Sequence, residues 1–368
     1  MQDMRKKRIV WIALALLAFG ACKKPAAAPR ETIGLVKSIV EDTTGLRSLA
    51  ASAGWMGADG SITLLGDPEE VVLLSRRFQE VDARDNVDGR HKPDSLPDFA
   101  GEHFEALLDV YNAPYSHFVG SSLDSLREVA VRGALHAWDT VSYRSPSDSR
   151  GLLKKESAKI LILTSSLQAE FGLFDVDTLQ QLVGGKCRVL SPVEILLDSV
   201  FSRGGQNVAV WASDPVRETE VWNLAFGRKH AEDATLSVYT PEEAVDVRTR
   251  LRDLLRQYQV TGLPLDALIV DSYQVNIGPL QSELALIRLC GTEEDAAFDA
   301  MLSKDFRFLQ PSDALIEHTY NILREENLFA HRVARPQVKY YESAESESGE
   351  IVLVEAAASY VKKAYVCE

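Results

Sequence analysis

The chain has 368 residues, of which 46% are hydrophobic and 26% charged, and its formal net charge is −14. These proportions are ordinary for a globular protein, and the length suits one large domain or two lobes. A negative charge of this size repels phosphate backbones, so the composition argues against nucleic acid as a partner.

The first segment of the chain has the pattern of an export signal. Four basic residues at positions 5–8 precede an uncharged apolar run from Ile9 to Phe19. The run is too short to span a bilayer, which takes about 20 residues. A basic start, a short apolar core and small residues before a cleavage point are typical of a signal that is removed on export.

Positions 20–22, Gly-Ala-Cys, resemble the lipobox of bacterial lipoproteins, with Phe19 in place of the usual leucine. The resemblance implies that residues 1–21 are a signal peptide and that Cys22 is lipidated. Residues 22–30 then form a Pro/Ala-rich tether. We therefore expect an exported protein held in the bacterial cell envelope by lipid on Cys22, with the membrane as its partner through that lipid.

Residues 31–150 form a region that is either α/β or mostly helical. Asp67-Pro68 is a strong helix start, because Asp is a good cap and Pro suits the first turn. The polar segment 82–98 is a loop, and long loops are often functional. The other expected elements are helices over 33–51 and 123–139, a strand over 61–65, and a strand or helix over 104–110.

Residues 151–368 alternate short apolar strands with amphipathic helices. This alternation predicts right-handed crossovers and a parallel sheet with helices on both faces, an α/β fold in one body or two lobes. Together with the leader and tether, this layout resembles periplasmic solute-binding lipoproteins. The strands are expected at 159–163, 187–190, 207–211, 235–239 and 267–270.

Polar residues follow the carboxyl ends of these strands, where parallel α/β sheets bind their ligands. The Asp271–Tyr273 segment is the best candidate, because Tyr is not a usual helix cap, whereas Ser and Asp also cap the helices that begin there. The predicted ligand-binding residues are Ser165, Ser166, Ser213, Asp214, Asp271, Ser272 and Tyr273.

Carboxylates and imidazoles gather between Asp82 and His103, and such groups act as metal ligands or acid–base catalysts. Their spacing matches no metal-binding motif, so no metal and no cofactor are predicted. No common catalytic motif occurs in the chain. The leading hypothesis is therefore a membrane-tethered lipoprotein that binds a small polar ligand. The alternatives are a carboxylate and histidine hydrolase, with or without a divalent metal, and a scaffold for another envelope protein.

Overall fold

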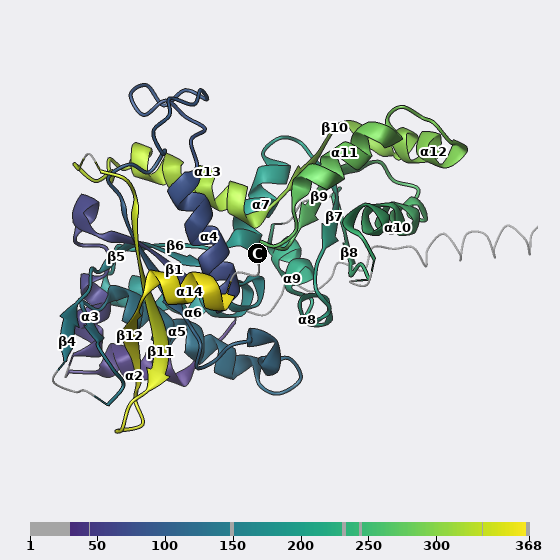
Figure 1. Ribbon diagram of the computed structural model, residues 1–368. Coiled ribbons are helices and arrows are strands. Elements are labelled where there is room, and N and C mark those ends of the chain that lie inside the picture. The colour runs from purple at the N-terminus through teal and green to yellow at the C-terminus, as the bar shows by residue number, and fades with distance from the viewer. Residues whose placement is uncertain are drawn as a thin grey trace, which may run out of the picture. The chain divides into compact units, whose positions relative to one another are not determined.

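The computed structural model of the chain is shown in Figure 1. It describes residues 30–43, 45–147, 151–229, 233–242, 245–332 and 334–365. The expected signal peptide, Cys22 and nearly all of the tether lie outside these residues. None of the helices in the described segments is both long and apolar enough to cross a bilayer. The chain divides after Thr32, and the unit Ile33–Glu368 contains both sheets and the helices that cover them.

The larger of two sheets has eight strands, and its centre is parallel. Towards one edge of this sheet, two pairs of neighbouring strands are antiparallel. In spatial order the strands are β4 (Leu152–Lys154), β3 (Val141–Tyr143), β12 (Ile351–Ala356), β11 (Gln337–Glu345), β2 (His103–Leu108), β1 (Ser61–Gly66), β5 (Ala158–Leu163) and β6 (Arg188–Leu190).

The second sheet has four strands and is parallel throughout. Its order is β10 (Leu302–Leu309), β9 (Leu265–Val270), β7 (Asn207–Trp211) and β8 (Thr235–Tyr239). The α/β prediction is therefore confirmed, with a largely parallel arrangement flanked by helices. One feature differs: the strands expected over 151–368 do not form a single sheet. β5 and β6 pair with β1 in the larger sheet, whereas β7 to β9 form the smaller one.

Helices cover both faces of the larger sheet (Figure 1). On one face lie α2 (Gly34–Glu41), α3 (Leu46–Ser52), α5 (Leu123–Trp138) and α6 (Ser166–Val183), whose apolar residues form one core with Leu65 and Leu107. On the other face lie α4 (Pro68–Glu80), α13 (Pro311–Glu325) and α14 (Ala358–Tyr365), which pack on Ile62 and Leu64. The alternation of side chains along β1 thus supplies both cores.

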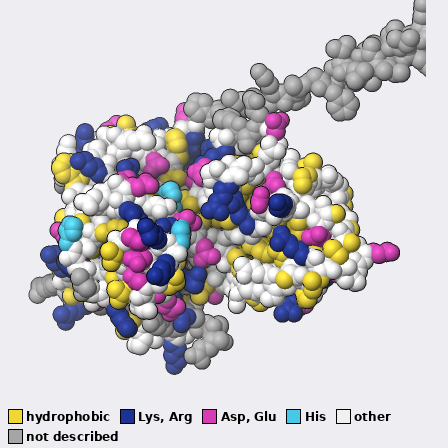
Figure 2. Space-filling view, turned by 90° about the horizontal axis from the view of Figure 1, so that it is seen from above, with side chains coloured by type: hydrophobic (Ala, Val, Ile, Leu, Met, Phe, Trp, Pro, Cys, Tyr) yellow, Lys and Arg dark blue, Asp and Glu magenta, His cyan; other side chains and the backbone are white. Residues whose placement is uncertain are grey.

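The smaller sheet is covered in the same way. One face packs against α6, α7 (Pro192–Phe201), α8 (Asp214–Glu218) and α9 (Val221–Arg228). The other packs against α10 (Val247–Gln259), α11 (Ile277–Ile287) and α12 (Glu293–Met301). On the face seen in Figure 2, basic and acidic side chains are interspersed. The excess negative charge is therefore not gathered into one patch on that face.

Several boundaries differ from the sequence prediction. The helix expected over 33–51 is two helices: α2 ends at Glu41, and α3 begins at Leu46. Helices α8 and α9 are likewise separate, because Glu220 takes a left-handed backbone conformation between them. The sequence patterns missed α12, β10 and α14 altogether.

Candidate functional site

The carboxyl ends of β5 and β9 meet, although these strands belong to different sheets. Ser166 Oγ donates a hydrogen bond of 2.7 Å to Asp271 Oδ1, and Tyr273 Oη donates one of 2.9 Å to the carbonyl of Thr164. Trp222 Nε1, in α9, donates at 2.8 Å to the other carboxylate oxygen of Asp271. These contacts join the two sheets and fix the Asp271 carboxylate between two donors.

Three more carboxyl groups lie at the ends of β1 and β2. Asp67 directly follows β1, Glu70 lies in the first turn of α4, and Asp109 directly follows β2. We call Asp67, Glu70, Asp109 and Asp271 the strand-end site. The Asp67 carboxylate makes no capping hydrogen bond to α4 and instead accepts one of 3.2 Å from the backbone N–H of Tyr115.

Asp109 is the most deeply buried member of the strand-end site, with 6% of its surface exposed. Its Oδ2 accepts a hydrogen bond of 2.9 Å from Tyr115 Oη, and its Oδ1 accepts one of 2.8 Å from Ser343 Oγ in β11. Asn112 Nδ2 donates to both oxygens, and Gln168 Nε2 in turn donates to Tyr115 Oη. Asp109 is therefore fully hydrogen-bonded and holds Tyr115 in place.

Burial raises the pKa of the remaining carboxyl groups. Removal from water raises the pKa of Asp67 from 3.8 to about 6, although the Tyr115 N–H opposes the shift. The pKa of Glu70 lies well above its usual range because of burial and the charges of Asp67 and Asp271. Burial also raises the pKa of Asp271, against its two hydrogen-bond donors. The side chain of Glu70 has one weak partner, Thr164 Oγ1 at 3.4 Å.

No lysine or arginine compensates these charges within the described residues. The ion pairs that those residues form lie elsewhere in the molecule, and none includes a member of the strand-end site. The nearby His117 imidazole lowers the pKa of Asp67, but its effect is smaller than those of burial, the Tyr115 N–H and the Asp109 charge. The site therefore favours a bound proton or a bound cation.

The structure brings together three of the residues that the sequence singled out, Ser166, Asp271 and Tyr273. Ser165, the residue before α6, is buried, and its side chain makes no capping hydrogen bond. Ser272 serves the turn after β9, because its Oγ accepts from the backbone N–H groups at 274 and 275.

Ser213 and Asp214 are exposed at the start of α8 and lie outside the strand-end site. The Asp214 carboxylate pairs with Arg217 at 2.8 Å, three residues on in the same helix. The side chain of Ser213 makes no capping hydrogen bond. Neither residue has a described contact with Asp271, although both follow the neighbouring strand β7.

Sequence reasoning missed Asp67, Glu70, Asp109 and Tyr115. A usable signal was present for two of them, because Asp67 and Asp109 each follow an apolar strand directly. The positional rule that selected Asp271 selects them as well. No comparable signal marks Glu70 or Tyr115, whose places in the site depend on packing.

The acidic loop 82–98 has a structural role. Asp82 accepts hydrogen bonds from the backbone N–H groups of Asp94 and Ser95, and Asp98 accepts them from Ala83 and Arg84. These carboxylates replace the backbone pairing that a helix or strand would supply. Across the described part of the chain, no group of three His, Cys, Asp or Glu side chains is arranged to hold a metal ion.

The two described thiols lie away from the strand-end site. Cys187 is buried just before β6, at the opposite end of the sheet from the carboxyl edge, and burial raises its pKa to about 12. Cys290 is exposed beyond the end of α11. At neutral pH the Cys187 thiol is therefore protonated and unreactive.

Comparison with known proteins gives a fold but no family. No protein-family model and no curated protein matches the sequence. The glutamate racemase of Francisella tularensis, solved with D-glutamate, is 13% identical and has a TM-score of 0.50, with 84% of this chain and 95% of that chain covered. For glutamate racemase RacE1 of Bacillus anthracis the identity is 12% and the TM-score 0.48, with 78% and 89% covered. The fold is thus similar to the two-domain fold of glutamate racemase.

This likeness corrects the functional hypothesis drawn from the sequence. The leading hypothesis was a lipoprotein that binds a small polar ligand. It rested on the resemblance between the order of elements in the sequence and the layout of solute-binding lipoproteins. The fold is instead similar to that of glutamate racemase, so the hypothesis of a solute-binding layout that holds a small polar ligand is wrong. The comparison supports neither the carboxylate and histidine hydrolase nor the envelope scaffold.

Proposed function

We propose that the protein is an enzyme that transfers protons at the α-carbon of a neutral or basic amino acid bound at the strand-end site. One observation carries the proposal: two neighbouring carboxyl groups, Asp67 and Glu70, lie at the carboxyl end of a buried strand, and burial raises the pKa of both. Neighbouring acids with raised pKa values are typical of a site of acid and base catalysis.

Asp67 suits the role of base. With a pKa of about 6 it is mostly ionised at neutral pH, yet it is more basic than an ordinary aspartate. Its carboxylate takes the α-proton, and the electron pair left on the carbon is delocalised into the carboxyl group of the substrate. Glu70, whose pKa is raised well above its usual range by burial and by the charge of Asp67, returns a proton to the carbon. No electrons are gained or lost overall.

The charge of the site supports an amine-bearing substrate. The Asp271 carboxylate, oriented by Ser166 and Trp222, is placed to accept a hydrogen bond from an ammonium group. A second carboxylate on the substrate would add negative charge among acids that form no ion pair with a described lysine or arginine. Burying that extra charge without a partner costs free energy. The Francisella racemase was solved with D-glutamate. We infer that the present site shares the amine of that ligand and rejects its acidic side chain.

The test is hydrogen–deuterium exchange at the α-carbon. The full-length protein is incubated in D₂O with lysine, ornithine, alanine, serine, glutamate or aspartate, and NMR follows the loss of the α-proton signal. We expect exchange with basic or neutral amino acids and none with glutamate or aspartate. Exchange of glutamate alone would refute the substrate class, and no exchange with any member would refute the reaction.

Variants then assign the exchange to the site. Asp67→Asn and Glu70→Gln keep the shape of each side chain and should each lower the exchange rate by about 10²- to 10⁴-fold. Asp214→Asn is the matched control, because Asp214 also follows a strand but is exposed and outside the site. Its exchange rate should equal that of the wild type. Unchanged rates in both site variants would remove Asp67 and Glu70 from the mechanism.

A further inference from the structure

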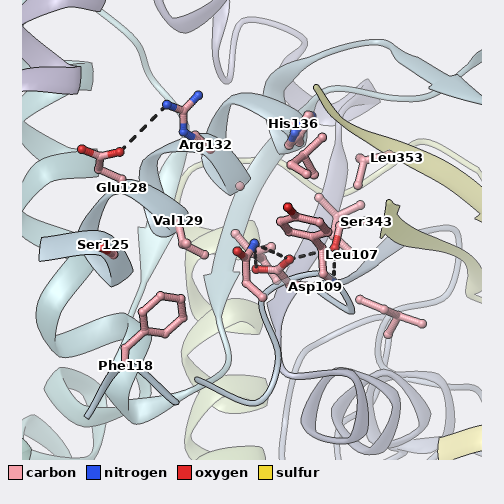
Figure 3. A pocket seen from close by; sticks show the side chains of 16 residues that line it. Leu107, Asp109, Phe118, Ser125, Glu128, Val129, Arg132, His136, Ser343 and Leu353 are labelled. Carbon is pink, nitrogen blue, oxygen red and sulfur yellow. Dashed lines mark hydrogen bonds and ion pairs between the residues drawn. The ribbon is translucent and has the colours of Figure 1, made fainter. Parts of the chain in front are cut away.

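A cavity lies between α5 and the larger sheet, on the face opposite α4. Its volume is about 270 Å³. Residues at helical spacing along α5, among them Val129 and His136, face residues of β2, β11 and β12 across it (Figure 3). We call this cavity the α5 pocket. Its walls are mostly apolar and include Leu65, Leu107, Phe118, Val129, Ile351 and Leu353.

The α5 pocket exists although α5 packs closely on the sheet at one point. A Cβ at Gly133 would lie 2.5 Å from a methyl carbon of Leu65, so glycine allows the helix to approach there. On the same face of the helix, Val129 is one turn before Gly133 and His136 is about one turn after it. Their side chains border open space rather than the sheet.

His136 is one of the polar side chains that line the pocket; no hydrogen bond of its imidazole occurs within the described residues, and the residue is partly exposed. Burial lowers its pKa, so the imidazole is neutral at pH 7 and offers one N–H donor and one acceptor nitrogen. Asp109 and Ser343 also border the pocket, but they already bond to each other. The His136 imidazole is therefore a hydrogen-bonding group at the pocket that no described protein group occupies.

The surroundings define what fits. Apolar walls favour an apolar body, and the nearby Asp109 carboxylate disfavours an anion. At the mouth, Glu128 and Arg132 approach each other to 3.9 Å and remain largely exposed, so their charges are solvated (Figure 3). A dry cavity of about 150 Å³ holds one benzene molecule, so the α5 pocket has room for about ten non-hydrogen atoms.

We propose that the α5 pocket binds a small neutral molecule with an apolar, bicyclic-sized body and one hydrogen-bonding group that meets His136. This site is distinct from the strand-end site. It shares only Asp109 with that site, and it does not depend on the proposed proton transfer. Apolar lining with a single oriented polar group is the usual composition of small-molecule sites.

The probe is indole, which has one N–H, and the matched probe is indene, which has the same shape without it. Binding to the full-length protein is measured by saturation-transfer NMR and by the rise in melting temperature. We expect indole to bind, and indene to bind about two- to tenfold more weakly because it lacks the hydrogen bond. Absence of indole binding at millimolar concentration would overturn the proposal.

Two variants locate the binding. Val129→Trp fills the pocket and should abolish indole binding, whereas Leu182→Trp, a control on an exposed part of α6, should leave it unchanged. His136→Phe keeps the ring volume but removes both nitrogens, so it should make indole and indene bind equally. This variant also keeps the test decisive should Val129→Trp fail to fold. Indole binding that survives Val129→Trp, or a preference for indole that survives His136→Phe, would refute the site.

Discussion

Replacing Asp67 by asparagine should stabilise the fold at pH 8 while it removes the proposed base. The native state ionises a carboxyl group that burial has made a weak acid, so folding at high pH costs free energy. Asparagine keeps an oxygen that can accept the 3.2 Å hydrogen bond from the Tyr115 N–H. It does not have to ionise, so the cost disappears.

The size of this effect follows from the two pKa values. The unfolded chain loses the proton at about 3.8, and the folded protein loses it at about 6. Below pH 3.8 both states hold the proton and the variant gains nothing. Between these values the wild type loses stability as the pH rises, and above pH 6 the loss is complete. At about 1.36 kcal/mol per pH unit, the shift corresponds to roughly 3 kcal/mol.

Urea melts of both proteins between pH 4 and pH 8 measure the difference in free energy of unfolding. That difference should be small at pH 4 and should grow towards about 3 kcal/mol by pH 7 to 8. Asp214→Asn, measured in parallel, should show no such growth because Asp214 is exposed. A difference that is constant with pH, or an Asn variant that is less stable at pH 8, would refute the reasoning.

Three further predictions concern other parts of the chain. Lys159→Met leaves the Glu102 carboxylate buried without its 2.7 Å ion pair, so denaturant melts should show a loss of about 3–5 kcal/mol in the free energy of unfolding. Adding Glu102→Leu should restore part of that loss, and equal stability of the single and double variants would contradict this prediction. Gly54→Ala should lower the free energy of unfolding by about 1–3 kcal/mol, because Gly54 has φ +74° and a Cβ would lie 2.4 Å from the backbone nitrogen of Cys187. An unchanged midpoint in the same melts would contradict this prediction. Cys22→Ser should move the protein from the membrane fraction to the soluble fraction, and retention on membranes at high salt would show that the leader is not a lipoprotein signal.

Much of the secondary structure of this chain, although not α12, β10 or α14, could be read from local patterns. Asp67-Pro68 marked the start of α4, and the apolar runs at 159–163 and 207–211 are strands β5 and β7 with boundaries within one residue. These features depend on neighbours in the sequence, through capping, proline geometry and side-chain alternation. The α/β class follows from their order.

The partners of the strands were decided by the tertiary structure. β6 and β7 are consecutive in the chain and look alike in the sequence, yet they lie in different sheets. β11, from near the end of the chain, pairs with β2 from its first third. An apolar run identifies a strand but not its neighbour, because every such strand presents the same backbone groups for pairing.

In the strand-end site, too, some features follow from the local sequence and others from tertiary packing. The sequence placed Asp271 at the carboxyl end of a strand, because that position follows from local pattern alone. It treated Asp67 as a helix cap and attached no significance to Asp109, although both occupy the same kind of position. What distinguishes these carboxyl groups is burial and the approach of one to another, and both arise from packing between segments far apart in the chain. A pKa depends on water and charge in three dimensions, so only the folded structure could identify which acids are perturbed.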